Sequence, residues 1–238
     1  MGWLGVGQPR YGPSQVAAGA VATIKGENMN KYGFSASLVS ITPNPETLIL
    51  HCARVSSDQS NDSVGLLGYL INHKHWSPFE MAHAVFEIET TRGIAAQILR
   101  HRSFSFQEFS QRYSKPDKYV PIRARRQTEK NRQSSVDDLS EDATDWFYEV
   151  QEEIWENAQS VYNKGMALGI SKESLRFILP LNTQTKLYMA GSIRSWIHYI
   201  QLRIQEDVQE EHRVIAARIR DLLALQIPNT AKALGWLE

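Results

Sequence analysis

Residues 100–114 read RHRSFSFQEFSQRYS, a short stretch that concentrates cations and hydroxyl groups. It opens with an Arg-His-Arg run at 100–102 and continues to Ser110 and Arg112. Adjacent cations repel one another unless an anion lies among them, and the histidine between the two arginines should then stay neutral. The stretch is therefore either a solvated surface loop or a binding site for phosphate groups.

The whole chain has the composition of an ordinary protein with a hydrophobic core. Of its 238 residues, 42% are hydrophobic and 22% are charged, with 26 Lys and Arg balancing 26 Asp and Glu. This balance argues against wholesale coating of nucleic acid, so an anion site must be a local concentration of charge. No window approaches the roughly 20 apolar residues of a membrane span, and the first residues do not resemble a signal peptide. The single cysteine, Cys52, excludes an internal disulfide and favours the cytoplasm.

The apolar pattern around the opening stretch predicts one α+β domain at 34–238, preceded by a loosely ordered or disordered extension at 1–33. Alternation predicts strands in FSASLVSI and MAHAVFEIETT, and helical spacing predicts helices elsewhere. The predicted helices cover 42–56, 63–76, 92–100, 143–169, a short one from 171 that Pro180 stops, 184–204 and 206–226. The expected architecture is a small, mostly antiparallel sheet with a large helical part.

We make separate predictions for one long helix and for the polar segment before it. The helix at 143–169 carries an apolar stripe that is predicted to face the core, formed by Trp146, Val150, Ile154, Ala158 and Val161. The polar segment at 115–142 is either a solvated, partly mobile loop or a lid that faces a substrate. Its basic part contains Arg123, Arg125, Arg126, Lys130 and Arg132, and its acidic part contains Asp137, Asp138, Glu141 and Asp142.

The spacing around the Arg-His-Arg run suits a nucleotide. If the preceding helix persists to Arg100, then Gln97 and Arg100 share one face of it. Extended chain beyond the helix would project Glu108, Ser110 and Arg112 to one side, because side chains alternate along a strand. Arg binds phosphate through two parallel hydrogen bonds. The segment could therefore bind a phosphate, a sugar and a polar base, with a charged surface loop as the alternative.

The motif resembles a known signature. Arg100-His101-Arg102, seven residues and then Ser110 match the signature of the flavin-dependent thymidylate synthases. Three further blocks resemble the family in the same order, namely HKHWSPFE at 73–80, LRFILPLN at 175–182 and IRSWIHYIQLR at 193–203. The resemblance runs from about residue 34 to 226, which is most of the chain.

The resemblance implies a homotetramer with shared active sites that methylates dUMP to dTMP. Methylenetetrahydrofolate would supply the carbon, and FAD reduced by NADPH would carry the hydride. Positions that match the family's dUMP-binding residues are Gln97, Arg100, Glu108, Ser110, Arg112, Arg176 and Arg203. Positions that match its FAD-binding residues are His75, Ser77, Arg100, His101, Arg102, Glu108, Ser192, Arg194 and His198. Arg203 would be catalytic, as a cation that stabilises negative charge developing on the uracil ring.

Several positions depart from the family pattern. Met81 stands where His is frequent, and Ser192 and His198 replace Asn. A His-x-Gln element frequent in the family appears here as Asp207-Val208-Gln209, so Asp207 is assigned no role. The changes at Ser192 and His198 bear on FAD affinity and redox tuning. Arg194 and His198 are four residues apart, so one face of a helix can present both.

Other functions are weaker readings of the same residues. Cys52 lies on the apolar side of a predicted helix, so we expect a buried structural cysteine and not the nucleophile of a cysteine-dependent thymidylate synthase. The histidines at 73, 75 and 83 have no Cys partners, and no metal site is expected. Ser110 has no nearby base in the sequence and is expected to bind a ligand through its hydroxyl.

The alternative from a different class is a nucleic-acid-binding module. It would use the Arg-rich motif and the basic loop for phosphates, with Phe104, Phe106 and Tyr113 as stacking surfaces. The zero net charge and the acidic run after the basic loop oppose this, and no nucleic-acid or membrane partner is expected. A catalytically inactive relative would require lost site residues, whereas Arg203 and the motif are intact.

Overall fold

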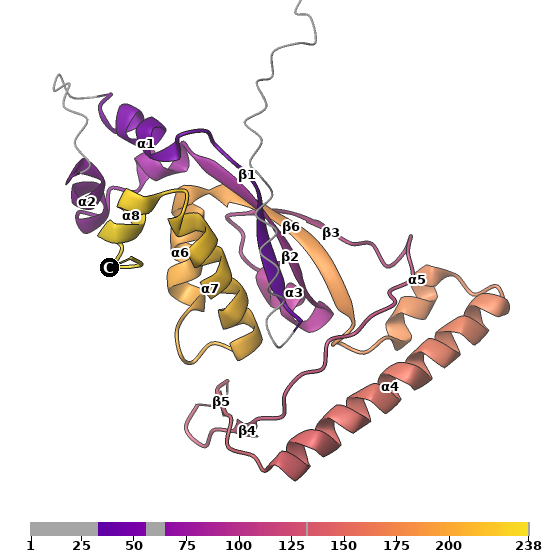
Figure 1. Cartoon of the computed structure of the whole chain (residues 1–238). Coiled ribbons are helices and arrows are strands. Elements are labelled where there is room, and N and C mark those ends of the chain that lie inside the picture. The colour runs from indigo at the N-terminus through magenta and orange to yellow at the C-terminus, as the bar shows by residue number, and fades with distance from the viewer. Residues whose placement is uncertain (1–32, 56–64, 132, 238) are drawn as a thin grey trace, which may run out of the picture.

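A computed structural model describes residues 33–55, 65–131 and 133–237 as an α+β domain with one main sheet (Figure 1). The prediction for residues 1–33 lies outside the described residues, apart from residue 33. The sheet is antiparallel, with strands in the order β1 (Ser35–Ile41), β2 (His83–Thr91), β6 (Gln184–Ser192) and β3 (Ser105–Glu108). The predicted α+β class and small antiparallel sheet are therefore confirmed.

Helices cover one face and one end of this sheet. The helices are α1 (Pro45–Ala53), α2 (Gly65–Asn72), α3 (Arg92–Ile98), α4 (Glu141–Ala167), α5 (Lys172–Leu175), α6 (Ile193–Arg203), α7 (Glu210–Ala224) and α8 (Pro228–Ala233). Two 3-10 turns, η1 (Ser77–Glu80) and η2 (Arg176–Ile178), and a small hairpin of β4 (Arg126–Gln127) and β5 (Ser135–Val136) complete the described elements. Figure 1 shows α6 and α7 packed together beside the sheet, and α4 at its opposite side. No helix in the described ranges is long and apolar enough to cross a membrane.

The core lies between the sheet and the paired helices α6 and α7. On β2 the alternate residues Ala84, Phe86 and Ile88 are buried, as the alternation predicts. The Phe86 ring meets the fully buried Trp196 of α6 edge to face, with ring centres 4.7 Å apart. The Trp196 indole N–H donates to the Ala84 carbonyl at 3.1 Å, so the polar atom of this large side chain is satisfied within the core.

The prediction of one helix at 184–204 is wrong in its first half. Residues 184–192 form β6, the strand that pairs with both β2 and β3, and α6 begins only at Ile193. Every second residue of β6 is buried, including Leu187 and Met189, and this period of two fits a strand and not a helix. The last predicted helix also ends early, and the chain beyond it forms α8.

The apolar stripe of α4 is not part of the core, contrary to prediction. Trp146, Ile154 and Val161 are 61%, 51% and 47% exposed, and of the stripe only Ala158 is buried. The helix instead buries a neighbouring face that includes Trp155, because it packs against the chain before it and against α5 and η2. The stripe is left as an exposed apolar surface on this chain.

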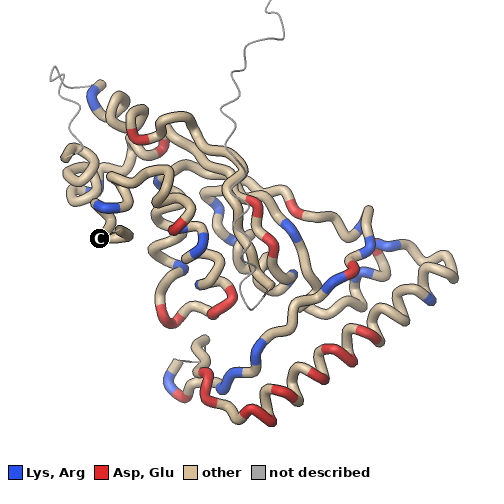
Figure 2. Tube along the Cα trace, viewed as in Figure 1, with Lys and Arg blue, Asp and Glu red and all other residues tan. Residues whose placement is uncertain are grey.

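The polar segment at 115–140 is anchored in the structure rather than freely solvated. The Gln151 side chain of α4 holds Ile122 by accepting from its N–H and donating to its carbonyl, both at 2.8 Å. Arg125 forms a buried ion pair with Glu211 at 2.5 Å. Two further pairs, Arg123–Asp137 and Arg126–Asp138, close the hairpin. Figure 2 shows the basic residues of this segment on chain that runs beside the acidic helix α4.

Candidate functional site

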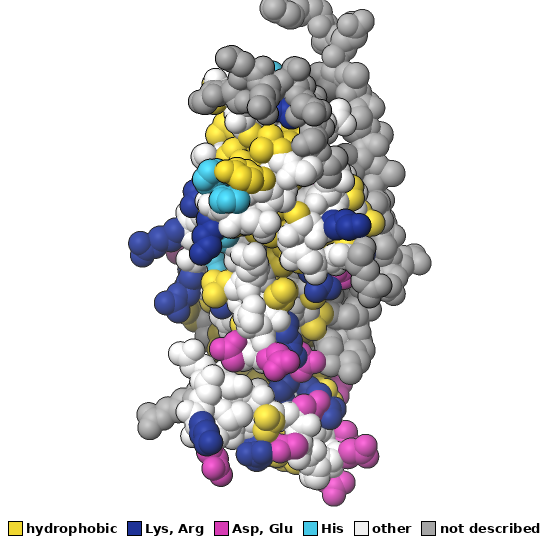
Figure 3. Space-filling model, turned by 90° about the vertical axis from the view of Figure 1, so that its left-hand side faces the viewer, with side chains coloured by type: hydrophobic (Ala, Val, Ile, Leu, Met, Phe, Trp, Pro, Cys, Tyr) yellow, Lys and Arg dark blue, Asp and Glu magenta, His cyan; other side chains and the backbone are white. Residues whose placement is uncertain are grey.

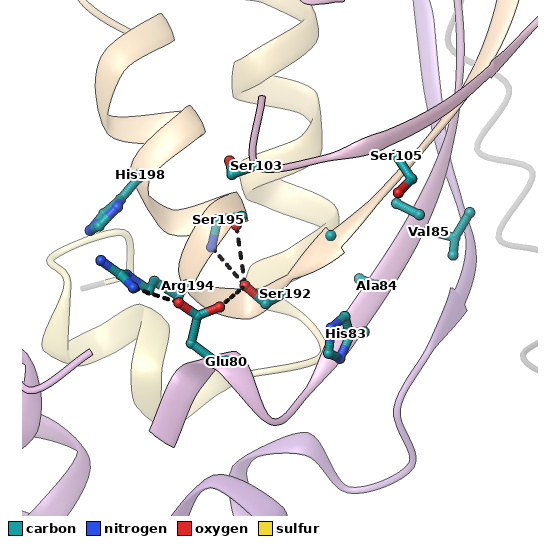
Figure 4. A pocket seen from close by; sticks show the side chains of 12 residues that line it. Glu80, His83, Ala84, Val85, Ser103, Ser105, Ser192, Arg194, Ser195 and His198 are labelled. Atoms are coloured by element: carbon teal, nitrogen blue, oxygen red, sulfur yellow. Dashed lines mark hydrogen bonds and ion pairs between the residues drawn. The ribbon is translucent and has the colours of Figure 1, made fainter. Parts of the chain in front are cut away.

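A cleft of about 550 Å³, here called the α6 cleft, opens at the start of α6 (Figure 4). Ser192 caps this helix, because its hydroxyl oxygen accepts a hydrogen bond from the Ser195 N–H at 3.2 Å. Arg194 and His198 follow on the face that lines the cleft, so their predicted alignment is confirmed. The cleft is lined by Glu80, His83, Ala84, Val85, Ser103, Ser105, Ala190, Gly191, Ser192, Arg194, Ser195 and His198.

Glu80 organises this cleft and was not among the predicted site residues. Its carboxylate accepts from the Arg194 guanidinium at 2.5 Å and from the Ser192 hydroxyl at 3.1 Å. The hydrogen bond from Arg194 lowers the pKa of Glu80 more than burial raises it, and the weaker effect of the Ser192 hydrogen bond lowers it further. The Arg194 Nε is buried without a partner among the described residues. Glu80 ends the block HKHWSPFE, which was the available sequence signal.

His198 connects this cleft to the chain before η1. Its ring meets Trp76 edge to face at 5.0 Å, and Trp76 lies between His75 and Ser77, two residues predicted for FAD. Partial burial and the neighbouring Arg194 lower the pKa of His198. Neither His75 nor Ser77 lines the α6 cleft itself.

His75 belongs to a surface cluster of rings instead. Tyr69 stacks on His73 at 4.0 Å and meets His75 edge to face at 6.1 Å. Figure 3 shows histidine side chains beside a hydrophobic patch on this side of the molecule, with Lys and Arg side chains next to them.

A glycine that lines the α6 cleft leaves room for an aromatic ring to pack against β6. Gly191 lies near the end of β6, and a Cβ atom built there would come within 2.5 Å of the Phe104 ring. Phe104 in turn packs edge to face on Trp196 at 4.7 Å. The position therefore needs a residue without a side chain, because any larger residue would displace this ring.

At the other end of α6, Arg203 meets His101. The Arg203 Nε–H donates to His101 Nε2 at 2.9 Å, which makes this nitrogen an acceptor and the imidazole neutral. Burial, and then the charge of Arg203, lower the pKa of His101 to about 4. The prediction of a neutral His101 is confirmed, although its two sequence neighbours are not the cause.

Gln97 lines a second cleft of about 490 Å³, here called the α3 cleft. The Gln97 amide donates to the Gln209 side-chain oxygen at 2.7 Å. Because α3 ends at Ile98, the exposed Arg100 does not continue its helical face, contrary to prediction. The lining is mostly apolar, formed by Thr91, Gly93, Ile94, Gln97, Ile122, Phe147, Gln151, Ile154, Pro180, Leu181, Asn182 and Gln209.

The predicted extended run from Glu108 to Arg112 is also wrong. The strand β3 ends at Glu108, whose carboxylate accepts from Arg92 and from the Thr185 hydroxyl, the latter at 2.9 Å. The chain then turns, and Arg112 pairs with Glu173 of α5 at 3.1 Å. The turn places Arg112 beside α5 and not on one side of an extended strand.

Five of the seven predicted dUMP residues therefore fall into two groups. The Arg203 group comprises Gln97 and Arg203, at the ends of α3 and α6, together with His101, which was predicted for FAD and pairs with Arg203. The α5 group comprises Ser110, Arg112 and Arg176, the last with its guanidinium 5.1 Å from the Phe177 ring. Figure 1 shows α5 and the chain after β3 at one end of the sheet, away from α6 and α7. Within the described chain, no hydrogen bond or ion pair joins the two groups.

The competing sites find less support. Cys52 is only partly buried, contrary to prediction, and lines neither cleft. The described residues contain no group of three or more His, Cys, Asp or Glu side chains placed to hold a metal ion. The arginines at 123, 125 and 126 of the basic loop are each paired with a carboxylate, which removes much of the basic surface that a nucleic-acid module would use. Arg132 lies outside the described residues.

Comparison with known proteins gives a consistent result. The family model described as thymidylate synthase complementing protein matches residues 37–229. A flavin-dependent thymidylate synthase of Synechocystis sp. is 52% identical over 195 residues, which cover 81% of this chain and 91% of that protein. A probable flavin-dependent thymidylate synthase of Paramecium bursaria Chlorella virus 1 is 47% identical over 215 residues, covering 85% and 100%.

Solved structures show the same fold. A UMP/dUMP methylase, PolB from Streptomyces cacaoi bound with 5-Br UMP, superposes with a TM-score of 0.77 at 26% identity. The match covers 85% of this chain and 93% of the methylase chain. The same enzyme bound with 5-Br dUMP gives a TM-score of 0.76 at 25% identity.

Proposed function

The chain belongs to the flavin-dependent thymidylate synthase family, and from this premise we propose that it methylates dUMP to dTMP with FAD as cofactor. Methylenetetrahydrofolate is the carbon donor and NADPH the reductant. The observation that carries the proposal is the pairing of Arg203 with a neutral His101, because it holds a cation in a fixed position beside a residue predicted to bind FAD.

Arg203 acts on the uracil ring through charge. Its Nε is used by His101, and no described residue occupies the two terminal nitrogens, which remain for the substrate. A guanidinium held in this way stabilises negative charge that develops on the base as its carbon becomes nucleophilic. Because His101 is uncharged, it orients the guanidinium without adding a second positive charge beside it.

The α5 group is suited to the phosphate of dUMP. Arg112 and Arg176 supply guanidinium groups and Ser110 supplies a hydroxyl, which together match the chemistry of a phosphate. Among the described residues Arg112 is paired only with Glu173, and both side chains are more than half exposed, at 60% and 56%. An exposed pair of this kind is weak, so a phosphate can replace the Glu173 carboxylate at little cost.

The α6 cleft fits the polar part of FAD. The buried Nε of Arg194 has no partner in the part of the chain that the structure describes, and serine hydroxyls line the same cavity. Glu80 and Ser192 hold Arg194 and the start of α6 in place, and His198 offers a ring nitrogen at the rim. FAD bound here and reduced by NADPH would supply the hydride that completes the methyl group.

We further propose a homotetramer in which one subunit contributes the Arg203 group and another contributes the α5 group. Two observations support this. The groups are separated within one chain, and α4 exposes an apolar stripe that includes Trp146 and Ile154. Phe177 and Leu181, near the α5 group, are 80% and 76% exposed. Exposed apolar surface of this extent marks an interaction site, and a second copy of the chain would bury it.

Complementation between two inactive variants tests the shared site. Arg203→Ala should lower kcat by roughly 10²- to 10³-fold through loss of charge stabilisation, with FAD still bound. Arg112→Ala should mainly weaken dUMP binding. Co-expressed as mixed tetramers, the two variants should recover activity in about a quarter of the sites, because those sites combine two intact groups. If mixtures recover none while wild-type protein forms dTMP, each site lies within a single subunit.

A further inference from the structure

A chain of three hydrogen bonds runs from the core to Gln97 and Gln209, which line the α3 cleft. Tyr199 of α6 and His212 of α7 are both fully buried, and the Tyr199 hydroxyl lies 3.2 Å from His212 Nε2. His212 Nδ1 lies 3.2 Å from the side-chain oxygen of Gln97. The Gln97 amide nitrogen donates onward to Gln209 at 2.7 Å. Three helices and the segment before α7 are joined by this path.

One direction of the donors along this path leaves every buried hydrogen with a partner. Burial raises the pKa of Tyr199, so its hydroxyl stays protonated. Among the described residues its one hydrogen-bond partner is His212 Nε2, and the hydroxyl is assigned as the donor because otherwise its own buried hydrogen would have no acceptor. A neutral imidazole has one donor and one acceptor, so Nδ1 must carry the hydrogen and donate to Gln97. Burial lowers the pKa of His212 most, followed by the positive charge of Arg203 and that of His101 when His101 is protonated. Together they bring this pKa to about 3, so the His212 ring is neutral.

We propose that Tyr199 and His212 are positioning residues that fix the amide of Gln97, so that its N–H group and not its carbonyl faces the α3 cleft. One hydrogen of the Gln97 nitrogen is used by Gln209, and the second is directed to the ligand. An N–H group there donates to a carbonyl oxygen of uracil and opposes the amino group of cytosine. The inference rests on the proposed function and adds how the site distinguishes dUMP from dCMP.

Reversing the Gln97 side-chain amide would cost free energy because of its contact with His212. A reversed Gln97 would place its amino group against the Nδ1–H of His212, where two donors face one another and neither has a partner. Leaving a buried donor without a partner is more costly than losing an ordinary hydrogen bond. Without the Tyr199 hydroxyl, His212 can exchange its tautomer and accept from the reversed amide. The phenol therefore controls a group two hydrogen bonds away.

Four variants of the full-length, FAD-loaded protein test this. Tyr199→Phe removes only the hydroxyl, and His212→Leu removes both polar atoms of the link. His212→Gln retains a donor for Gln97 and an acceptor for Tyr199, so it should rescue the direction of the amide. The matched control is Tyr162→Phe, because Tyr162 is also fully buried and its hydroxyl has no partner among the described residues.

The measurements are dissociation constants for dUMP and dCMP by calorimetry, and KM and kcat for dUMP. Tyr199→Phe and His212→Leu should weaken dUMP binding by about five- to tenfold, as expected for one lost hydrogen bond, and should reduce the preference over dCMP. KM should rise with little change in kcat, because the contact acts on ground-state binding. His212→Gln and Tyr162→Phe should keep the wild-type preference.

Each outcome has one meaning. Suppose that the wild-type protein binds dUMP and that Tyr199→Phe and His212→Leu keep the wild-type preference for dUMP over dCMP. The inference is then wrong, and the proposed function stands. An equal loss in Tyr162→Phe would also overturn it, because a general effect on packing would then explain the result. If wild-type protein binds neither nucleotide, the proposed function fails and this inference fails with it.

Discussion

The buried His212 should make the protein's stability depend on pH in a way that one substitution removes. The pKa of His212 is lowered from its ordinary value of 6.5 to about 3 by burial and by the cations Arg203 and, when protonated, His101. The unfolded chain therefore takes up this proton at a higher pH than the folded chain does. Stability is complete above about pH 6.5 and falls as the pH is lowered toward 3.

The size of the effect follows from the two pKa values of His212. At about pH 4.5, the unfolded histidine is protonated and the folded one is still neutral, so each pH unit below 6.5 costs about 1.4 kcal/mol. Lowering the pH from about 7.5 to 4.5 should thus remove about 2.7 kcal/mol of unfolding free energy through this residue. The His212→Gln variant does not titrate and should lack this part of the loss.

Urea unfolding of both proteins at the two pH values measures this difference, at one fixed protein concentration and without added nucleotide. His101 titrates in a similar range, but it is present in both proteins and cancels in the comparison. Equal losses of stability in wild type and His212→Gln would show that His212 is not buried as a neutral imidazole. The hydrogen-bond direction proposed for Gln97 would then lose its basis.

Three further substitutions have defined outcomes. Arg125→Met should cost about 3 to 5 kcal/mol in urea unfolding, because Glu211 is left buried and charged, and adding Glu211→Leu should restore much of the loss. Gly191→Ala should cost about 1 to 3 kcal/mol by forcing the Phe104 ring aside, and unchanged stability would show that this ring moves freely. Cys52→Ala should cost less than about 1 kcal/mol and keep dTMP formation, whereas a folded variant without chemistry would make the thiol catalytic.

The sequence predicts local structure well where one pattern dominates. The alternation of β2 and the four-residue spacing of Arg194 and His198 both appear as expected. It fails at β6, because the helical signal of α6 extends back over residues whose place in the sheet depends on pairing with β2 and β3. It also fails for the α4 stripe, because apolar spacing cannot distinguish a core face from a surface that another subunit would cover.

The functional site is likewise only partly predictable from the sequence. The motif at 100–110 identifies the chemistry of the ligand, but the turn after β3 separates Arg112 from Arg203, and no spacing rule indicates that. Glu80 is indicated in the sequence only as the end of the block HKHWSPFE, through the resemblance, and its contact with Arg194 joins residues 114 positions apart. His212 gives no signal in the sequence, since its role arises only where three helices meet.

The most direct test of the central claim is formation of dTMP by the FAD-loaded protein with dUMP, methylenetetrahydrofolate and NADPH, compared with Arg203→Ala under anaerobic conditions. We expect one dTMP for each NADPH oxidised by the wild type, and a severe loss in the variant although its bound flavin is unchanged. A wild-type protein that binds flavin and dUMP but forms no dTMP, or an Arg203→Ala variant as active as wild type, would contradict it.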